Sequence, residues 1–399
     1  MPMSTDQILD WIETQHTHML DEVIAWSNIN TYTLNFGGIN ALSEKITQSF
    51  SIFDEKIYHL ELPTYRHINF RGEMSEAKLA PVIILKKRPH AQRQGLFVLH
   101  LDTPYPPHDS LQEAFLIEGK ILRGQGVSDS KGGIAVLLKA LEAFEKSEHA
   151  HKVGWTVVMN TDEKIGSPNS AKILEQHAKR SDLGFVFDPC LPDGKLISKR
   201  KGSGHFTLVA RRKNSNSKTN TIALIAQCIN DIQSLTHAHP GIDINIGIVQ
   251  GGSSMDNLPN VALTKFVVKI STREEQFLIE NKLDEIIQKY SDKDNVSLEL
   301  YGEFLLPPKM LDIQTLDLYS KVQDCGEELG LNLDWMESSN YCDANRLSAY
   351  GLPTIDTLGV QGGQFDENIE FMYIHSLKDR AKLAALVLIK WASGNWRLI

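Results

Sequence analysis

The residues best suited to chemistry are one histidine and four acidic residues that follow apolar runs or a Gly-rich turn. They are His100, Asp102, Asp129, Glu163 and Asp188. Ligand-binding groups gather at the carboxyl ends of strands in open α/β sheets, so we expect these side chains to lie together. Carboxylates clustered with one histidine suit a hydrolytic zinc site, where the metal activates water and a nearby free glutamate accepts its proton. Because Asp and Gly are also common at helix caps and in turns, a structural role for each residue stays open.

His100 and Asp102 directly follow the apolar run 95–100. An imidazole at a strand end can bind a metal, and a carboxylate two residues later can accept its other N–H and fix the tautomer. The same pair, met alone, is more often a surface pair.

The segment 124–133 (GQGVSDSKGG) presents Asp129 just ahead of a predicted helix. It lacks the third glycine of a dinucleotide-binding fingerprint and does not match a P-loop, so phosphate binding is not favoured. We expect its glycines to let the backbone approach a metal that Asp129 bridges.

Continuous apolar runs separated by helical patterns indicate how these residues are positioned. The runs are 95–100, 154–160 and 183–188, and a helical pattern spans 134–146. This alternation predicts a mainly parallel α/β sheet with buried strands. Apolar residues at helical spacing also predict an opening helix over 5–27, capped near Ser4 and Thr5, and a final helix over 380–392.

The middle of the chain has a different order of predicted strands and helices. The predicted strands are 205–212, 242–250, 261–271 and 296–302, and the predicted helices are 221–235 and 274–290. The order βαββαβ predicts a small α+β domain inserted in the larger one. We therefore assign 1–198 and 306–399 to one discontinuous domain and 199–305 to the insertion.

Composition excludes several classes of protein. The chain has 399 residues, 42% hydrophobic and 23% charged, which is typical of a globular protein with two domains. A formal net charge of −9 disfavours nucleic acid as a partner. We find neither a secretory leader nor an apolar run long enough for a bilayer, so we expect no membrane association and a cytoplasmic location. The four scattered cysteines predict reduced packing residues.

Several motifs together resemble one family. They are HLDTP (100–104), GQGVSDSKGG (124–133), TDEKIGS (161–167), FDP (187–189), GIVQGGSSMDNLPNVA (247–262) and CDANRLSAYGLPTIDTLGVQGG (342–363). They are similar to elements of the zinc-dependent amidohydrolase and exopeptidase family that includes glutamate carboxypeptidase, acetylornithine deacetylase, succinyl-diaminopimelate desuccinylase and aminoacylase. The resemblance runs from the first helix to the last. It implies a zinc-exopeptidase-like catalytic domain with an inserted lid.

Carried over by position, the resemblance implies a role for each polar residue. His100, Asp129 and Asp188 match the ligands of one zinc, Asp102 matches the residue that orients the histidine, and Glu163 matches the general base.

The resemblance also assigns residues to the substrate. Asn257 and Arg273 match lid residues that face the substrate in relatives, where an arginine would clamp a carboxylate. A turn amide and a surface salt-bridge partner are the open alternatives for these two. Gly362 and Gly363 are assigned to the same binding region.

The chain departs from the family pattern at the second zinc. With the register fixed by Gly166 and Gly362, one expected ligand position holds Lys164 and the other holds Asp366. An ammonium cannot donate a lone pair to a metal, so we expect Lys164 to lie between Asp129 and Asp366 in place of a cation.

These residues predict a metal-dependent hydrolase of amide bonds in N-acyl amino acids or small peptides, with one zinc ion and with cobalt or manganese as possible substitutes. The alternative is a catalytically impaired homologue that acts in binding or assembly. A homodimer through the lid is expected by resemblance only. The substrate side chain and acyl group follow from no motif in the sequence.

Overall fold

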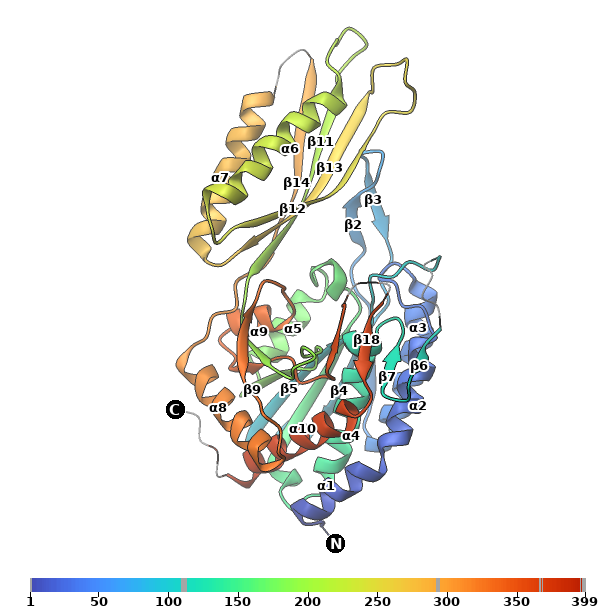
Figure 1. Ribbon diagram of the computed structural model, residues 1–399, viewed down its shortest axis with the longest axis vertical. Coiled ribbons are helices and arrows are strands. Elements are labelled where there is room, and N and C mark those ends of the chain that lie inside the picture. The colour runs from blue at the N-terminus through green and yellow to red at the C-terminus, as the bar shows by residue number, and fades with distance from the viewer. Residues whose placement is uncertain are drawn as a thin grey trace.

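A computed structural model describes residues 2–108, 113–291, 295–365, 367, 369–394 and 396 (Figure 1). The larger body contains a six-stranded sheet in the order β1-β4-β8-β5-β9-β16. Its strands are β1 (Ile57–Leu60), β4 (Val82–Lys87), β5 (Arg93–His100), β8 (Val153–Asn160), β9 (Leu183–Val186) and β16 (Thr354–Ile355). The pairs from β8 to β16 are parallel, and β1 and β4 add an antiparallel edge. The predicted α/β class with a mainly parallel mixed sheet is confirmed.

Helices cover both faces of this sheet, because neighbouring residues of a buried strand point to opposite sides. On β5, Phe97 and Leu99 pack into the larger core and Leu96 and Val98 into the smaller one. The larger core includes residues of α1 (Thr5–Thr14), α2 (His16–Ser27), α3 (Phe36–Phe50), α4 (Gly133–Glu145), α8 (Ile313–Glu328) and α10 (Ser376–Ser393). The smaller core is formed against α5 (Ala171–Ala178) and α9 (Ala344–Ala349).

The opening helix differs from its prediction. Ser4 caps α1 and forms a capping box with Gln7, as expected. The predicted single helix over 5–27 is wrong, since α1 ends at Thr14 and α2 begins at His16. All residues between Ile12 and Met19 are polar, so no continuous apolar stripe runs through this segment. The helix axis is therefore free to change at Gln15.

A second unit stands apart from this body at the upper end of the molecule in Figure 1. We call residues 202–306 the inserted unit. Its elements are β11 (Gly202–Arg212), α6 (Thr221–Ala238), β12 (Asp243–Gly251), β13 (Val261–Ile270), α7 (Arg273–Tyr290) and β14 (Val296–Leu306). Their order is the predicted βαββαβ, and the strands form a sheet in the order β12-β13-β11-β14 with its own core. The exact domain boundaries stay a prediction.

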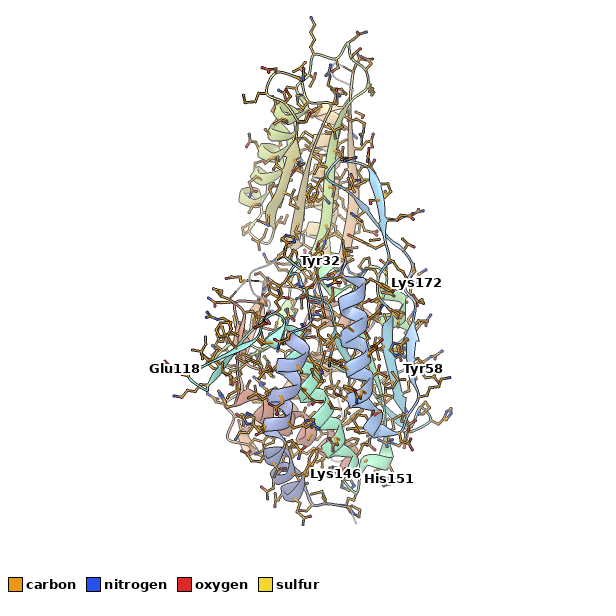
Figure 2. All side chains as sticks on the ribbon, turned by 90° about the vertical axis from the view of Figure 1, so that its right-hand side faces the viewer. Tyr32, Tyr58, Glu118, Lys146, His151 and Lys172 are labelled. Atoms are coloured by element: carbon orange, nitrogen blue, oxygen red, sulfur yellow. The ribbon has the colours of Figure 1, made fainter. Side chains whose placement is uncertain are left out.

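Smaller elements complete the larger body and connect it to the inserted unit. They are β2 (Tyr65–Ile68), β3 (Met74–Ala77), β6 (Phe115–Ile117), β7 (Ile121–Arg123), β10 (Leu196–Arg200), β15 (Trp335–Ser338), β17 (Gly362–Gly363) and β18 (Phe371–Tyr373). The two connecting segments are bonded to each other, because the backbone N–H groups of Arg200 and Lys309 each donate to the other residue's carbonyl. The hairpin β2-β3 rises beside the sheet of the inserted unit (Figures 1 and 2).

The cysteine prediction is confirmed, since Cys190, Cys228, Cys325 and Cys342 are free and buried. Among the helices in the described ranges, none combines the length and apolar character that crossing a bilayer requires. The cytoplasmic location stays a prediction.

Candidate metal centre

Three of the predicted residues meet at the carboxyl ends of the central strands. His100 is the last residue of β5, Asp188 follows β9 by two residues, and Asp129 lies in the irregular helical turn Val127–Gly132 that leads into α4. Each offers one ligand atom, and these atoms lie within 4.8 Å of one another. All three residues are buried. Parallel strands place their carboxyl ends at one edge, which is why residues so far apart in sequence come together.

Glycines make this convergence possible. Gly133 begins α4 against the end of β9, and a Cβ there would lie 2.1 Å from the Phe187 carbonyl oxygen. Gly126 begins the turn that carries Asp129 and has a φ of +66°, in the left-handed region that favours glycine. The Gly-rich segment therefore brings the Asp129 turn close to Asp188.

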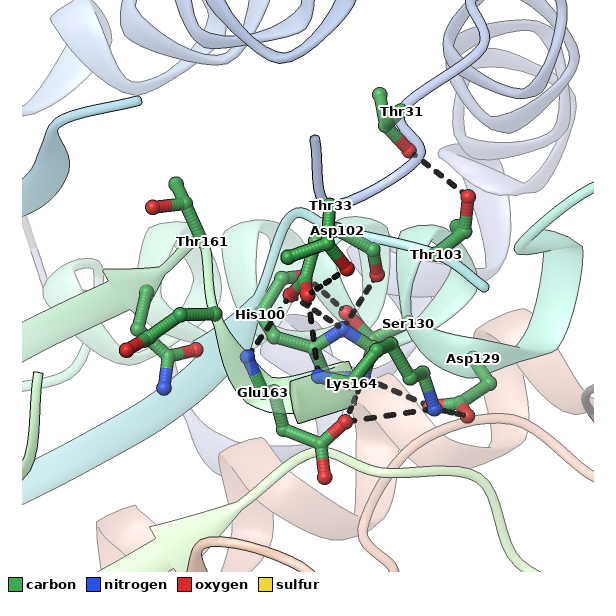
Figure 3. A network of polar contacts seen from close by, with 12 residues as sticks. Thr31, Thr33, His100, Asp102, Thr103, Asp129, Ser130, Thr161, Glu163 and Lys164 are labelled. Carbon is green, nitrogen blue, oxygen red and sulfur yellow. Dashed lines mark hydrogen bonds and ion pairs between the residues drawn. The ribbon is translucent and has the colours of Figure 1, made fainter. Parts of the chain in front are cut away.

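The His100 ring is fixed on both sides (Figure 3). Its Nδ1 lies 2.8 Å from the backbone oxygen of Asp102, and its Nε2 lies 2.8 Å from Oδ1 of Asp129. The Asp102 carboxylate is farther from Nδ1, at 3.7 Å. The group nearest to Nδ1 is thus the main chain of Asp102, rather than the side chain that the sequence suggested.

The Asp102 carboxylate instead holds the turn that carries the predicted base. It accepts hydrogen bonds from the backbone N–H groups of Glu163 and Lys164 at 3.1 and 3.0 Å, and from the Thr33 hydroxyl at 2.8 Å. Asp102 is fully buried, so these three donors replace the water that a carboxylate requires. Asp102 thereby links His100 to Glu163 through its backbone and its side chain.

Lys164 is directed into the cluster. Its Nζ forms an ion pair with Oδ2 of Asp129 and lies 3.4 Å from Oε2 of Glu163. The two oxygens of Asp129 are therefore divided between His100 and Lys164 (Figure 3). Asp366, the other residue at the altered metal position, lies outside the described residues.

Glu163 has the surroundings of a general base. Its Oε2 is buried, accepts no hydrogen bond from the described residues, and lies 4.0 Å from Nε2 of His100. Burial raises the pKa of Glu163 to about 8, against the lowering effect of Lys164 and His100. A carboxylate that is costly to keep charged and lacks a donor is suited to accept a proton.

The pKa shifts of the other groups show that the cluster attracts protons or other cations. Burial and the Asp129 charge raise the pKa of Asp188. Burial opposes protonation of His100, yet the charges of Asp129 and Glu163 raise its pKa to about 10. Burial likewise opposes ionisation of Asp129, but Lys164 and His100 hold its pKa below the ordinary value. The cluster therefore holds protons on His100 and Glu163, and a bound divalent cation would displace them.

Glu370 is a residue that the sequence analysis missed. One of its carboxylate oxygens accepts the backbone N–H groups of Ser128 and Asp129, both at 2.9 Å, and the Ser128 hydroxyl. The other accepts the Gly126 N–H at 2.9 Å and the Tyr105 hydroxyl at 2.7 Å. Glu370 thus holds the turn that presents Asp129. Its partners are more than 240 residues away in sequence, and no local pattern marks it.

A cavity of about 440 Å³ opens beside the cluster. Asp129, Glu163, Lys164 and Asp188 line its inner end. Further lining residues include Asn245, Val267 and Lys269 of the inserted unit, and Arg200, Asn340, Tyr341 and Phe365 of the larger body. The Lys269 ammonium donates to the Asn340 side chain at 3.0 Å, so the two parts meet at this wall.

The predicted substrate residues do not line this cavity. Asn257 is exposed on the loop between β12 and β13. Figure 1 shows this loop at the end of the sheet farthest from the larger body. Arg273 is exposed at the start of α7. Gly362 and Gly363 form β17 and pack under the Asp129 turn, where Ser128 and Phe371 approach them. The structure of a single chain therefore does not support a contact between these residues and the substrate.

The donor set fits a zinc ion. One imidazole nitrogen and two carboxylates are ligands that zinc accepts, and three protein ligands leave a position for water or substrate. Asp188 lines the cavity, and a divalent ion there would compensate the carboxylates of the cluster. Lys164 cannot be a ligand while its ammonium is charged.

Comparisons with known proteins agree with this geometry. A model of peptidase family M20/M25/M40 matches residues 96–390. Carboxypeptidase G2 from Pseudomonas sp. (strain RS-16) is 24% identical over 324 residues, which cover 78% of this chain and 77% of that protein.

Solved structures share the fold. The di-peptidase Dug1p from Saccharomyces cerevisiae superimposes with a TM-score of 0.77 at 12% identity, over 98% of this chain and 99% of that one. The YXEP protein of Bacillus subtilis, a dinuclear metal binding peptidase from the M20 family, superimposes with a TM-score of 0.65 at 14% identity, over 96% of this chain and 99% of that one.

Proposed function

Because the chain belongs to peptidase family M20/M25/M40, we propose that it hydrolyses amide bonds in N-acyl amino acids or small peptides with one bound zinc ion. His100, Asp129 and Asp188 would hold the ion. The observation that carries the proposal is the meeting of these three ligand atoms within 4.8 Å, beside a buried glutamate and at the end of a cavity.

The chain's own residues account for the proton transfers of such a reaction. Zinc, when bound, supplies a Lewis acid that polarises a carbonyl and lowers the pKa of water. Glu163 takes the proton of the attacking water and later gives it to the leaving amine as the C–N bond breaks. Its raised pKa suits both transfers, because the protonated and charged forms are close in free energy near neutral pH.

Lys164 supports a mononuclear centre. Its ion pair with Asp129 engages the carboxylate oxygen that would otherwise be available to a second ion. The ammonium also lies within 3.4 Å of Glu163, so it can stabilise the charged form of the base. Cobalt or manganese are candidate substitutes, since both accept nitrogen and oxygen ligands.

The alternative of a catalytically impaired homologue is not favoured. The changes at Lys164 and Asp366 would remove a second metal, yet His100, Asp129 and Asp188 would form a complete ligand set for one catalytic zinc. Carboxypeptidase G2 and the di-peptidase Dug1p, to which the chain is similar, are named as enzymes.

A homodimer through the inserted unit stays a proposal. β12 is an edge strand of its sheet, and Ile248, Val249 and Met255 on or beside it are exposed. Light scattering after size exclusion would give the mass of the particle, and a mass of one chain at micromolar concentration would rule the dimer out.

The activity is tested with a panel of N-acyl amino acids and dipeptides, assayed after chelation and reloading with zinc, cobalt or manganese. We expect metal-dependent release of free amine from at least one member, and loss of that release in Glu163→Gln. Absence of hydrolysis across the panel with every metal would contradict the proposal.

A further inference from the structure

A second cavity adjoins the one at the metal centre. We propose that it binds the part of the substrate remote from the scissile amide, and that this part is an apolar or aromatic group without positive charge. The inference rests on the proposed function and extends it to the substrate class. It also concerns residues that the metal centre does not use.

The second cavity has a volume of about 440 Å³ and lies between the hairpin β2-β3 and the sheet of the inserted unit. The hairpin contributes Tyr65, His67 and Ile68, and the sheet contributes Thr207, Lys265 and Tyr301 among others. Figures 1 and 2 both show the hairpin beside this sheet, on the side away from α6 and α7.

Strand register places both cavities on one face of the sheet. Val267 of β13 is paired with Asn245 of β12 and with His205 of β11, so the three side chains form a row across three strands. Asn245 and Val267 line both cavities. Two residues along β13, Lys269 lines the first cavity and Lys265 the second.

The two cavities therefore follow one another along the sheet, from the metal ligands to the hairpin. His205 and Tyr341 are in ring contact at 5.5 Å, and they line the second and the first cavity respectively. A substrate whose amide lies at Glu163 has a way past Lys269 and Val267 toward the hairpin.

The hairpin is held against the sheet by contacts that enclose the second cavity. The Lys265 ammonium donates to the Ile68 carbonyl at 2.6 Å, and Arg211 donates to the Gly72 carbonyl at 2.7 Å. Ile68 packs on Val209 and Leu263. Because polar and apolar contacts both hold it, the hairpin is a fixed wall.

The chemistry of the walls selects the occupant. Tyr65 and His67 are stacked, with ring centroids 5.3 Å apart, and Tyr301, Ile68 and Met74 add further apolar and aromatic surface. Among the described residues that line it there is no carboxylate, whereas Lys265 and Arg66 are cationic. An aromatic or aliphatic group gains contact area and dispersion here, whereas a cation would lie beside the Lys265 ammonium with no lining carboxylate to pair with.

The histidines of this cavity do not change that selection. Burial lowers the pKa of His205 to about 4 and, with Lys265, lowers the pKa of His67. Both rings are therefore neutral at pH 7 and add no positive charge to the cavity. Nδ1 of His67 and Nε2 of His205 are both buried without a hydrogen-bond partner in the described ranges, so a polar atom of the occupant has two places to bind.

The test compares three substrates that share one scissile amide: N-acetyl-L-alanine, N-(4-phenylbutanoyl)-L-alanine and N-acetyl-L-homophenylalanine. We expect the zinc-loaded enzyme to favour one extended member over N-acetyl-L-alanine by roughly tenfold or more in kcat/KM, as a filled apolar pocket can provide. The favoured member identifies whether the acyl or the amino side enters the second cavity.

Two variants locate this preference. Thr207→Trp fills the second cavity from the sheet, and we expect it to abolish the preference while kcat/KM for N-acetyl-L-alanine is unchanged. Ser297→Trp is the matched control, because Ser297 lies on the same face of the sheet in β14 but does not line the cavity. If Thr207→Trp does not fold, Tyr65→Ala removes one ring wall and is expected to raise KM for the favoured member alone.

A binding measurement separates failure of this inference from failure of the proposed function. Saturation-transfer NMR with 4-phenylbutanoate needs no turnover, and we expect binding to the wild type and to Ser297→Trp but not to Thr207→Trp. Hydrolysis of all three substrates at equal rates, or equal binding by the three proteins, would contradict the proposed role of the second cavity. The proposed hydrolase function would be unaffected by that result. Binding that follows the prediction without any hydrolysis would instead contradict the proposed function and support the second cavity as a binding site.

Discussion

Two buried charge clusters lie close together in this protein and are built in opposite ways. The metal cluster contains Asp129, Glu163 and Asp188 with one ammonium, from Lys164. The second, which we call the hinge cluster, contains Arg200, Lys309, Tyr319 and Asp356, where the two connections to the inserted unit meet.

The hinge cluster is satisfied by its own residues. Asp356 lies 3.0 Å from Nε of Arg200 and 2.9 Å from Nζ of Lys309, which also donates to the Tyr319 oxygen and the Ile197 carbonyl. Burial opposes ionisation of Asp356, yet the two cations hold its pKa below the ordinary value. In the metal cluster the pKa values of Glu163 and Asp188 are raised.

This difference separates a structural cluster from a binding site. Cations outnumber carboxylates at the hinge, and each group there has partners. Carboxylates outnumber cations at the metal cluster, and one oxygen of Glu163 has no donor among the described residues. Burying charge in this second way costs stability unless a ligand completes the cluster.

The largest effect on activity is expected for Glu163→Gln. Removal of the general base should lower kcat by roughly 10²- to 10⁴-fold. The unfolding free energy of the metal-free protein should stay the same or rise, because a buried carboxylate with a raised pKa is replaced by a neutral group. Steady-state kinetics and urea unfolding with a chelator check both parts, and a large loss of stability would contradict the contrast.

The opposite pattern is expected for Asp356→Ala at the hinge. Two buried cations lose their carboxylate, so the unfolding free energy should fall by about 3–5 kcal/mol. Urea unfolding measures the change, and the zinc content of the remaining folded protein should be unaffected. Lys309→Met is the milder control, since it leaves the Arg200 and Asp356 pair in place. Equal stability of Asp356→Ala and the wild type would show that the hinge cluster is not structural.

An intermediate effect is expected for Glu370→Gln. The variant weakens the acceptor for the backbone N–H groups of Ser128 and Asp129 and brings an amide N–H toward them. Loss of such supporting contacts typically lowers metal affinity by about 10- to 100-fold. Competition with a fluorescent zinc chelator gives the affinity. Unchanged affinity would show that the Asp129 turn keeps its position without this carboxylate.

The smallest effect is a pH dependence of stability. Burial raises the pKa of Asp162, in the turn before Glu163, to about 7. An unfolded aspartate titrates near 4. The folded state therefore holds a proton between pH 4 and 7 that the unfolded state releases, and stability should fall as the pH rises through this window, by less than about 1.4 kcal/mol per unit.

The contribution of Asp356 to stability changes with pH in the opposite direction. Its lowered pKa makes it a stabilising group above pH 4 whose contribution is lost on acidification.

Urea unfolding of chelated protein at pH 5, 6 and 7 should show a smaller slope of unfolding free energy against pH for Asp162→Asn than for the wild type. An identical slope in both proteins would mean that Asp162 is ionised in the folded state throughout this range.

Local patterns in the sequence predicted the central strands and the inserted elements, and they singled out three residues that the structure brings together. Apolar runs ended by polar residues identified β5, β8 and β9, and the parallel arrangement of those strands brought His100, Asp129 and Asp188 together. The order of the inserted elements followed from the change of hydrophobic period.

Contacts between distant segments were not visible in those patterns. Glu370 and the hinge cluster depend on residues that only the folded chain brings together, and an isolated glutamate or lysine has no spacing that reveals its partner. The atom of Asp102 that faces His100 could not be predicted, because the sequence gives no indication of which atom of a residue contacts a histidine. The hairpin β2-β3 is short and polar, so it lacked a clear strand signal.

We propose that Lys164 takes the place of a second metal ion, and the number of zinc ions bound per chain tests this proposal most directly. The protein would be stripped with chelator, reloaded with excess zinc, desalted and analysed for zinc per chain by atomic absorption, beside the double variant Lys164→Glu with Asp366→His. We predict one zinc per chain for the wild type and two for the double variant. Two zinc ions per wild-type chain, or none, would contradict the account.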